Sequence, residues 1–364
     1  MSEETSSHNW RRARVLINPD ALLNNLQRVR DYSPESRIMA VIKANAYGHG
    51  MLQAATVLDS ADMFAVAMPH EAYALRASGC TKPLLVLHGF NHIDELEKFS
   101  ALHISTVIHH STQLDVLLNS KLDIPVDTWL KVDTGMHRLG IPENDAEHYF
   151  GLLRNSSNVA KVYLMSHFAN ADETDNQLNN NQLEGFIKVT NDIDVESSMA
   201  NSAAIISMPK SHFEVVRPGI MLYGSSPFAG VTADELGLQA VMQFESELLA
   251  IKQLKAGDAV GYGSTFVADR DMTMGIVAAG YGDGYPRHAK NGTPVWINGH
   301  RCQLLGRVSM DSICIDLTGV EASVGDRVVL WGRELSIDEV AAASESIAYE
   351  LMCNAGAAYF SVRQ

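Results

Sequence analysis

The amino-acid sequence predicts an α/β protein with a smaller β domain attached. Between residues 38 and 217, eight short apolar stretches alternate with longer segments of helical periodicity. Beyond residue 235 the apolar runs become closely spaced, with turn signals such as Asn291-Gly292 and Asn298-Gly299 between them. We therefore predict a (β/α)8 TIM-like barrel over residues 11–234 and a mostly β domain over residues 235–364. Residues 1–10 are expected to form a flexible tail.

The predicted elements of the barrel follow one another along the chain. Asn18 and Pro19 open the first helix, because Asn18 can cap it and a proline at the first helical position has no N–H to lose. The predicted strands are residues 38–42, 63–66, 84–87, 104–108, 128–132, 162–166, 197–199 and 214–217. Predicted helices between them include residues 71–77, 93–99, 111–118, 145–155 and 176–192. A doubly wound sheet would give a similar alternation and is the alternative arrangement.

The second domain is predicted to consist mainly of short strands. These are residues 240–254, 259–262, 272–278, 294–297, 303–305, 312–316 and 327–330. Helical segments follow, and the first is opened by a capping box from Ser336 to Glu339.

The overall composition narrows the class of protein. Apolar residues make up 46% and charged residues 20% of the 364 residues, which is typical of a globular chain with a sizeable core. The net charge of −15 argues against a nucleic-acid partner. Four scattered cysteines without a CxxC pair suit a reduced compartment. The N-terminus is polar and acidic, and no apolar run is long enough to span a bilayer, so we expect a cytoplasmic protein with no membrane partner.

A lysine stands at the end of the first predicted strand. Lys43 follows the apolar run 38–42 and enters a turn that contains Tyr47, His49 and two glycines. A lysine whose stem is buried at such a boundary loses proton affinity and becomes a usable nucleophile or base. An ordinary strand-end lysine that extends its amine into water is the alternative interpretation.

The segment Val-Ile-Lys-Ala-Asn-Ala-Tyr-Gly-His-Gly around Lys43 closely resembles the pyridoxal-phosphate lysine motif of the alanine racemase family. Other segments similar to motifs of this family follow in the expected order, from roughly Arg14 to Met352. The resemblance implies a homodimeric isomerase that interconverts L- and D-alanine with pyridoxal 5'-phosphate and supplies D-alanine for peptidoglycan. The implied reaction is a two-base proton transfer at Cα of the cofactor-bound amino acid.

Polar clusters stand where further predicted strands of the barrel end, in segments 131–140, 166–170, 200–203 and 217–220. Catalytic residues of β/α barrels collect at the C-terminal ends of the strands, so we expect these clusters at one face. The resemblance assigns cofactor binding to Lys43, Tyr47, His167, Asn201, Ser202, Arg217, Gly219 and Ile220.

Arg217 would donate a hydrogen bond to the pyridine nitrogen without protonating it, because guanidinium keeps its proton. The ring is then a weaker electron sink, which favours simple return of the proton to Cα. A salt bridge at the mouth of the barrel is the alternative role for Arg217.

The resemblance names Lys43 and Tyr262 as the acid and base on opposite faces of Cα. Tyr262 lies in a segment, residues 260–265, that is similar to the second motif of the family. A tyrosine hydroxyl titrates near pH ~10, so its neighbours, which we take to be His167 and Arg217, have to tune it. Without the resemblance, a core aromatic on a strand would be the simpler interpretation.

Substrate recognition is assigned to Arg138 and Met310. Arg138 suits a carboxylate as a bidentate donor, and Met310 would contact it through its backbone N–H. In the family the lysine at the position of Lys131 is often carbamylated and orients this arginine, while an unmodified buried lysine is the alternative. Supporting roles fall to Asp311 and to two residues expected at the entrance, Tyr285 and Arg307.

In the family, the second domain of one subunit completes the site of the other. Tyr262 and Met310 are therefore expected to act in trans. The C-terminus departs from the usual basic-apolar ending, which leaves one phosphate or entrance contact open, with Tyr359 as a candidate substitute.

Other functions fit the sequence less well. No metal site is expected, because His103, His109 and His110 lack paired ligands at useful spacing. An amino-acid decarboxylase would need acidic or cysteine motifs that the sequence lacks, and a non-catalytic cofactor carrier would have no β domain. A racemase of broader specificity, or one that serves alanine catabolism, is the nearest alternative.

Overall fold

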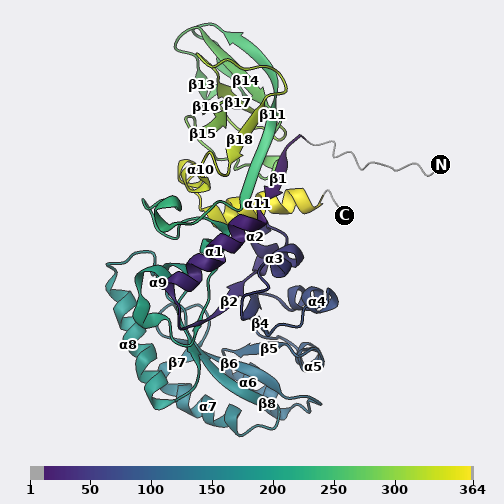
Figure 1. The fold of residues 1–364 in the computed structure, drawn as a ribbon, viewed down its shortest axis with the longest axis vertical. Coiled ribbons are helices and arrows are strands. Elements are labelled where there is room, and N and C mark those ends of the chain that lie inside the picture. Colours follow the sequence, from purple (N-terminus) through teal and green to yellow (C-terminus); the bar gives the residue numbers. More distant parts are fainter. Residues whose placement is uncertain (1–11, 362–364) are drawn as a thin grey trace, which may run out of the picture. The chain divides into compact units, whose positions relative to one another are not determined.

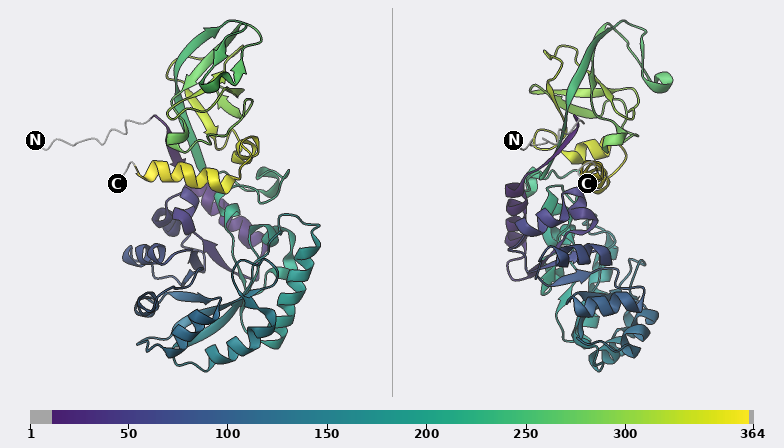
Figure 2. Two further views of the ribbon diagram at one scale, coloured as in Figure 1. Left: turned by 180° about the vertical axis from the view of Figure 1, so that it is seen from behind. Right: turned by 90° about the vertical axis from the view of Figure 1, so that its right-hand side faces the viewer.

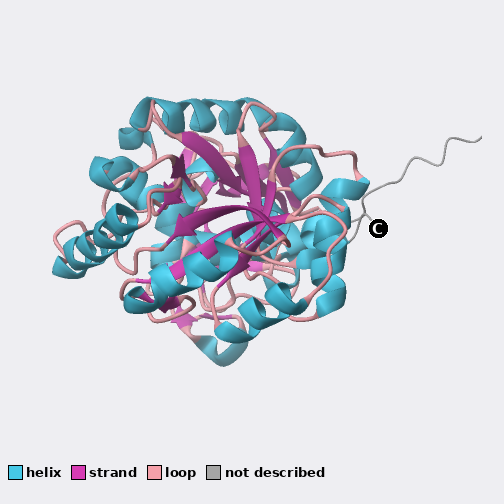
Figure 3. Cartoon of the chain, turned by 90° about the horizontal axis from the view of Figure 1, so that it is seen from below, coloured by secondary structure: helices cyan, strands magenta, loops and turns pink. Residues whose placement is uncertain are grey.

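Eight parallel strands surrounded by helices form the larger of two units, Pro19–Gln239, in the computed structural model, which describes residues 12–361 (Figure 1). The strand order is β10-β2-β3-β4-β5-β6-β8-β9, and each neighbouring pair is parallel. Because β10 pairs with β2, the sheet curves into a nearly closed barrel, and the predicted barrel is confirmed over the doubly wound sheet. Figure 3 shows the helices as a ring around these strands.

The barrel strands lie close to the predicted positions. They are β2 (Arg37–Val41), β3 (Met63–Val66), β4 (Leu84–Val86), β5 (Ser105–Ile108), β6 (Val126–Asp133), β8 (Val159–Met165), β9 (Ser197–Ser198) and β10 (Val215–Val216). A short extra strand, β7 (Ile141–Pro142), pairs with β6 and was not predicted. Nearly all residues of β2 to β5 are buried, as expected of strands that are covered on both faces.

The helices of the barrel alternate with its strands. They are α1 (Pro19–Tyr32), α2 (Lys43–Gly48), α3 (Met51–Val57), α4 (Pro69–Ala77), α5 (Ile93–Ala101), α6 (Ser111–Asn119), α7 (Ala146–Arg154), α8 (Gln177–Asp192) and α9 (Ser202–Ser207). Short 3-10 turns are η1 (Glu143–Asp145), η2 (Pro209–Ser211), η3 (Ile220–Tyr223) and η4 (Asp234–Leu236). Among the helices of residues 12–361, none is both long and apolar enough to cross a membrane.

The smaller unit is a β barrel of its own (Figure 2). Its strands pair in the order β11-β14-β17-β16-β15-β18, and β18 pairs back with β11 to close the ring. They are β11 (Met242–Leu254), β14 (Met272–Val277), β15 (Pro294–Ile297), β16 (His300–Leu305), β17 (Ile313–Asp316) and β18 (Arg327–Trp331). A small ribbon of β12 (Ala259–Val260) and β13 (Phe266–Val267), two 3-10 turns and two helices complete it: η5 (Tyr262–Ser264), η6 (Tyr281–Asp283), α10 (Ile337–Ala343) and α11 (Ala348–Ser361).

Two boundaries differ from the sequence prediction. Residues 11–18 were placed with the larger barrel, but Arg14–Ile17 form β1, which pairs antiparallel with β11 of the smaller unit. The other boundary falls at residue 240 rather than 235, because Asn25 of α1 holds Gln239 through hydrogen bonds to both its N–H and its carbonyl, each 2.8 Å. Both differences depend on partners more than 200 residues away, which local sequence patterns do not reveal. The predicted tail, residues 1–10, lies outside the described residues.

Candidate active site

Lys43 precedes a left-handed turn that comes just after β2. The four residues Ala44 to Tyr47 have φ between 52° and 55° and ψ between 40° and 51°, so α2 contains a left-handed turn rather than an α-helix. Left-handed backbone is disfavoured for residues with a Cβ, and none of these four is glycine. The sequence predicted a turn that contains two glycines here. The structure instead shows a strained turn made of four residues other than glycine, and Gly48 and Gly50 come after it in the chain.

Arg217 is buried at the end of β10 and donates to several acceptors. Its Nη1 donates to Ser198 Oγ at 2.6 Å, and its Nη2 donates to the carbonyl of Ser166 at 2.5 Å and to His167 Nδ1 at 3.2 Å. Within residues 12–361 no group accepts from its Nε–H, and no carboxylate pairs with the guanidinium. Burial lowers the pKa of Arg217 to about 10, so it stays charged at neutral pH. The alternative role as a salt-bridge arginine is therefore not what the structure shows.

His167 is held neutral by its surroundings. Burial, followed by the positive charges of Arg217 and Lys131, lowers the pKa of His167 well below its ordinary value. Because Arg217 donates to Nδ1, the proton of the neutral ring belongs on Nε2. Gln182 of α8 donates to the His167 carbonyl at 3.0 Å and accepts from Ala169 N–H, which steadies the loop after β8.

Lys131 is buried on β6 within the same group of cations. Its pKa is lowered to about 7, first by burial and then by the charges of Arg217 and Arg138, with Lys43 adding to the effect. Asp133 acts in the opposite direction but also accepts from Gly135 N–H and His137 N–H. Positive charge therefore outweighs negative charge here, which is the electrostatic signature of a site for anionic ligands.

Ser202, Tyr47 and the backbone at Gly219 lie together next to these cations. Ser202 Oγ accepts from Gly219 N–H at 2.9 Å and from Met221 N–H at 3.4 Å, which leaves its own hydroxyl hydrogen to donate. A Cβ at Gly219 would come within 2.7 Å of Tyr47 Oη, so glycine is needed for this close approach. The ring of Tyr47 stacks on Tyr223 at 4.7 Å. The predicted cradle residues are thus brought together in the barrel.

The remaining predicted residues of the barrel occupy defined places. Asn201 caps α9 by accepting from Ala204 N–H at 3.1 Å. Arg138 is exposed, in the loop after β6, and Ile220 is buried at the start of η3. Lys43, Lys131, Arg138 and Arg217 therefore come from three different strand ends and influence the same buried groups.

Tyr262 lies in the smaller unit and projects into solvent. It begins η5, and 72% of the residue is exposed. Gly263 of the same turn lies beside Arg307, since a Cβ there would be 3.4 Å from Arg307 Nη1. Met310 is likewise exposed, at 54%, and Asp311 follows it at the surface. The turn that carries Tyr262 therefore lies next to Arg307 within the smaller unit.

Tyr285 does not occupy the predicted position at an entrance. Its side chain is 1% exposed and stacks on Trp331, and burial raises its pKa far above the ordinary value. Tyr281, in the same glycine-rich segment, is the exposed tyrosine at 39%, and the N–H of neighbouring Gly282 donates to the Met310 carbonyl at 2.9 Å. The sequence pattern alone could not separate the two tyrosines, because packing against Trp331 decides which one is buried.

Sequence reasoning also missed several residues that shape the site. Glu71 of α4 accepts from the N–H of Ala44, next to Lys43, at 2.6 Å. The hydroxyl of Ser166 and the amide of Gln182 connect the loops after β6 and β8 through Thr134. Thr134 and Ser166 lie in the predicted polar segments but were given no role there. Glu71 and Gln182 lie outside those segments, and only their burial as polar groups distinguishes them. The side chain of Tyr359, the predicted C-terminal substitute, lies outside the described part of the chain.

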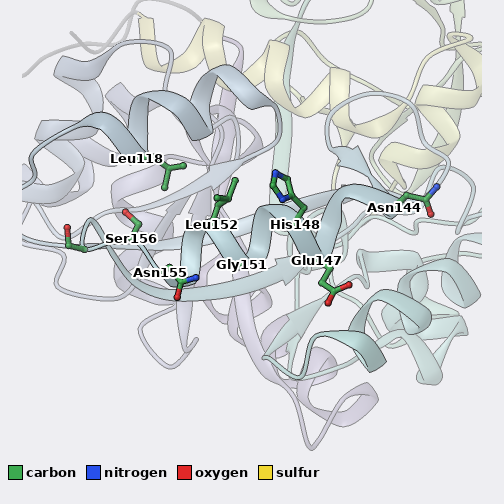
Figure 4. Close-up of a pocket in the computed structure, with 9 residues that line it drawn as sticks. Leu118, Asn144, Glu147, His148, Gly151, Leu152, Asn155 and Ser156 are labelled. Atoms are coloured by element: carbon green, nitrogen blue, oxygen red, sulfur yellow. The ribbon is translucent and has the colours of Figure 1, made fainter.

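A surface pocket of the larger unit lies elsewhere. It is lined by residues along α7, such as Glu147, His148 and Leu152, together with Leu118 of α6 (Figure 4). It contains none of the predicted site residues. Over the described ranges, no group of three or more His, Cys, Asp or Glu residues is arranged to hold a metal ion.

Comparisons with known proteins show to which family both units are similar. Residues 17–227 match the family described as "Alanine racemase, N-terminal domain", and residues 241–362 match "Alanine racemase, C-terminal domain". The alanine racemase of Vibrio parahaemolyticus is 46% identical over 343 residues, and the biosynthetic alanine racemase of Escherichia coli K12 is 47% identical over 344 residues. Each of these alignments covers 93% of this chain and 96% of the relative.

Solved structures extend the similarity to the fold. The biosynthetic alanine racemase of Pseudomonas aeruginosa superposes with a TM-score of 0.93 at 42% identity, covering 95% of this chain and 97% of that one. The alanine racemase of Bartonella henselae, solved with covalently bound pyridoxal phosphate, has a TM-score of 0.84 at 30% identity and covers 95% and 98%. The predicted resemblance is confirmed over both units, and the chain belongs to the alanine racemase family.

Proposed function

We propose that this protein interconverts L- and D-alanine with pyridoxal phosphate, in a homodimer in which each subunit supplies Tyr262 to its partner. The observation that carries the proposal is the group of Lys43, Lys131, Arg138 and Arg217 around a buried neutral histidine. This group offers an amine for the cofactor aldehyde and cations for a phosphate and a carboxylate. Relatives named as biosynthetic racemases favour a role in supplying D-alanine for peptidoglycan. A cytoplasmic location is part of the proposal.

The residues of the barrel fit this cofactor. The Nε–H of Arg217 lacks an acceptor among the described residues, and a pyridine nitrogen would supply one. The free hydroxyl hydrogen of Ser202, the hydroxyl of Tyr47 and the backbone at Gly219 and Ile220 suit phosphate oxygens. Lys43 would hold the aldehyde carbon. When bound, the cofactor supplies an electron-withdrawing ring that makes the Cα proton of alanine acidic.

The protein then has to bind alanine, orient its Cα and move one proton. The Arg138 guanidinium pairs with the carboxylate of alanine and orients Cα between two proton carriers. The Lys43 amine removes or returns the proton at one face, and the Tyr262 hydroxyl acts at the other. Arg217 donates from Nε but keeps its own proton, since its pKa of about 10 lies above the working pH. His167, neutral with its proton on Nε2, can donate from Nε2 to the Tyr262 hydroxyl.

A dimer is proposed from the surface of the smaller unit. Tyr262, Met310 and Tyr281 are all exposed there, although aromatic and methionine side chains are typical of buried interface cores. A partner's barrel would cover them and would bring Tyr262 opposite the partner's Lys43. Lys131, with a pKa near 7, is proposed to carry a carbamate that orients Arg138.

The test is an assay in deuterium oxide that follows both enantiomers of alanine. Wild-type dimer should form D-alanine from L-alanine with deuterium at Cα. Tyr262→Phe should lose racemisation by at least about 10²-fold, while Lys43 still exchanges the Cα proton of one enantiomer. Tyr149→Phe, on the outer helix α7, is the control and should behave as wild type.

Two results would count against the proposal. A cofactor-loaded wild-type dimer that forms no D-enantiomer from alanine would exclude the racemase activity. Small and equal losses in both directions for Tyr262→Phe would exclude the two-base scheme. Serine, lysine and arginine as substrates test the alternative of broader specificity.

A further inference from the structure

The left-handed turn after Lys43 needs support from elsewhere in the fold. Left-handed helical backbone is disfavoured for residues with a Cβ, and Ala44 to Tyr47 are four such residues in a row. Strain of this kind persists only where surrounding contacts over-determine the conformation. The direction in which Lys43 leaves the strand end depends on this turn.

Part of the support comes from the turn itself. His49 Nδ1 lies 3.0 Å from the Ala46 carbonyl and 2.9 Å from the Tyr47 carbonyl, so this nitrogen carries the proton and donates to both. Asn45 Oδ1 accepts from Met51 N–H at 2.8 Å. These contacts close the C-terminal side of the turn, and they leave the first peptide, between Lys43 and Ala44, to another partner.

That partner is Glu71, from the first turn of α4. Its Oε1 accepts from Ala44 N–H at 2.6 Å, and its Oε2 accepts from Ala67 N–H and Met68 N–H at 2.9 and 3.1 Å. The side chain is 7% exposed, and no cation of the described chain forms a salt bridge with it. A buried carboxylate without a cation depends on such N–H donors, so the three bonds hold one another in place.

The three N–H donors to Glu71 follow two neighbouring strands of the barrel. Ala44 follows β2, and Ala67 and Met68 follow β3, the strand that pairs with β2 in parallel. Glu71 therefore ties the ends of two neighbouring strands together at the mouth of the barrel. Its bond to Ala44 N–H fixes the plane of the peptide that immediately follows Lys43.

We propose that Glu71 is a positioning residue for Lys43, acting through the Ala44 N–H. The inference rests on the proposed function, because it assigns Lys43 its catalytic role. Glu71 does not touch the reacting atoms. It sets the backbone from which the Lys43 amine reaches Cα, so its loss should lower turnover rather than substrate binding.

Glu95 provides a matched control. It occupies the first turn of the next helix, α5, and its Oε2 accepts from Asn91 N–H at 2.7 Å in the loop before that helix. Glu95 therefore accepts a hydrogen bond from the loop before its helix, as Glu71 does, but it has no bond to the turn after Lys43.

The experiment compares Glu71→Gln, Glu71→Asp and Glu95→Gln in the cofactor-loaded enzyme. Glutamine places an amide N–H where a donor already points, and aspartate keeps the charge but is too short to reach both strand ends. Both Glu71 variants should lower kcat by about 10- to 100-fold in both directions with KM within about threefold, since small misplacements of a reacting group cost this much. Glu95→Gln should stay within twofold of wild type.

Amide hydrogen exchange gives a readout independent of activity. Exchange over residues 43–50 should accelerate at least about tenfold in the Glu71 variants, whereas Glu95→Gln should affect only residues near 91. The aspartate variant is measured whether or not the glutamine variant folds.

The proposal is overturned if either folded Glu71 variant keeps wild-type kcat or wild-type exchange over residues 43–50. It is also overturned if Glu71 and Glu95 variants lose activity equally, in step with their melting temperatures. An inactive wild-type enzyme would instead refute the proposed function, while the exchange measurement would still test the contact itself.

Discussion

Arg217 Nη2 lies 3.2 Å from His167 Nδ1, and this contact determines the tautomer of the histidine. Guanidinium can only donate, so Nδ1 must be the unprotonated nitrogen. Burial and the nearby cations lower the pKa of His167 in the same sense. The site therefore contains a neutral imidazole whose Nε2–H is available, held by an arginine that has no carboxylate partner in the described chain.

The first prediction concerns this tautomer. In nitrogen-15 spectra of the wild-type enzyme, His167 should remain neutral with its proton on Nε2 at pH 6, where an unperturbed histidine with a pKa near 6.5 is largely charged. A charged ring at pH 6 would contradict the cationic surroundings described above.

Replacing Arg217 with lysine should destabilise the barrel. One ammonium cannot reach Ser198, Ser166 and His167 together, and each unsatisfied buried acceptor costs about 1–3 kcal/mol. We expect the free energy of unfolding of Arg217→Lys to fall by about 2–4 kcal/mol in denaturant titrations. Arg37→Lys, which alters a half-exposed ion pair with Glu196, should cost less than about 1 kcal/mol. Equal losses of stability in the two variants would show that the buried guanidinium of Arg217 has no special role.

The close approach of Gly219 to Tyr47 leads to a rescue experiment. The Cβ of Gly219→Ala would lie 2.7 Å from the Tyr47 hydroxyl, and overpacking of this kind costs about 1–3 kcal/mol. Adding Tyr47→Phe removes the clashing oxygen and leaves ring carbon at 3.4 Å, so stability measured by thermal unfolding should be partly restored. Gly151→Ala on α7, where nothing lies within 4 Å, is the control and should not destabilise. A double variant less stable than Gly219→Ala would argue against this geometry.

His49 should make stability depend on acidity. Burial lowers the pKa of His49 from 6.5 to about 4, so between these pH values the unfolded chain binds a proton that the folded chain does not. The stability that the neutral ring contributes is therefore fully present above pH 6.5 and is lost as the pH falls towards 4. Over this range the free energy of unfolding should fall by roughly 3 kcal/mol.

The measurement is a denaturant titration of wild type and His49→Asn from pH 7 to 4, at fixed protein and cofactor concentration. The difference in unfolding free energy should narrow as the pH falls, because only the wild type carries this penalty. His300→Asn, at an exposed position, should keep a constant difference. A constant difference for His49→Asn as well would refute the assignment.

Lys131 is predicted to react with carbon dioxide near neutral pH. Because burial and neighbouring cations lower its pKa to about 7, a large fraction of the amine is neutral and nucleophilic at pH 8 and little is at pH 6. Carbon-13 spectra of enzyme equilibrated with labelled bicarbonate should show a carbamate signal that grows over this range. The signal should vanish in Lys131→Met and persist in Lys161→Met, which changes an exposed lysine on β8.

Much of the site could be predicted from the sequence because its residues belong to short, contiguous segments. Lys43, His167, Ser202 and Arg217 each follow a strand, and a parallel barrel brings strand ends to one face whatever the details of packing. The (β/α)8 order itself follows from the alternation of apolar runs with helical segments. Those signals are local, so one chain is enough to identify them.

Other features were decided only by tertiary structure. Tyr285 and Tyr281 lie in one segment, yet stacking on Trp331 buries the first and leaves the second exposed. Strand Arg14–Ile17 belongs with the second unit because its backbone pairs with β11. The left-handed turn after Lys43, and the bond from Ala44 to Glu71 that supports it, likewise depend on a partner distant in sequence. The sequence determined which residues reach the site. Packing and the pairing of buried polar groups decided their orientation, because those interactions join segments that are far apart in the sequence and show no common local pattern.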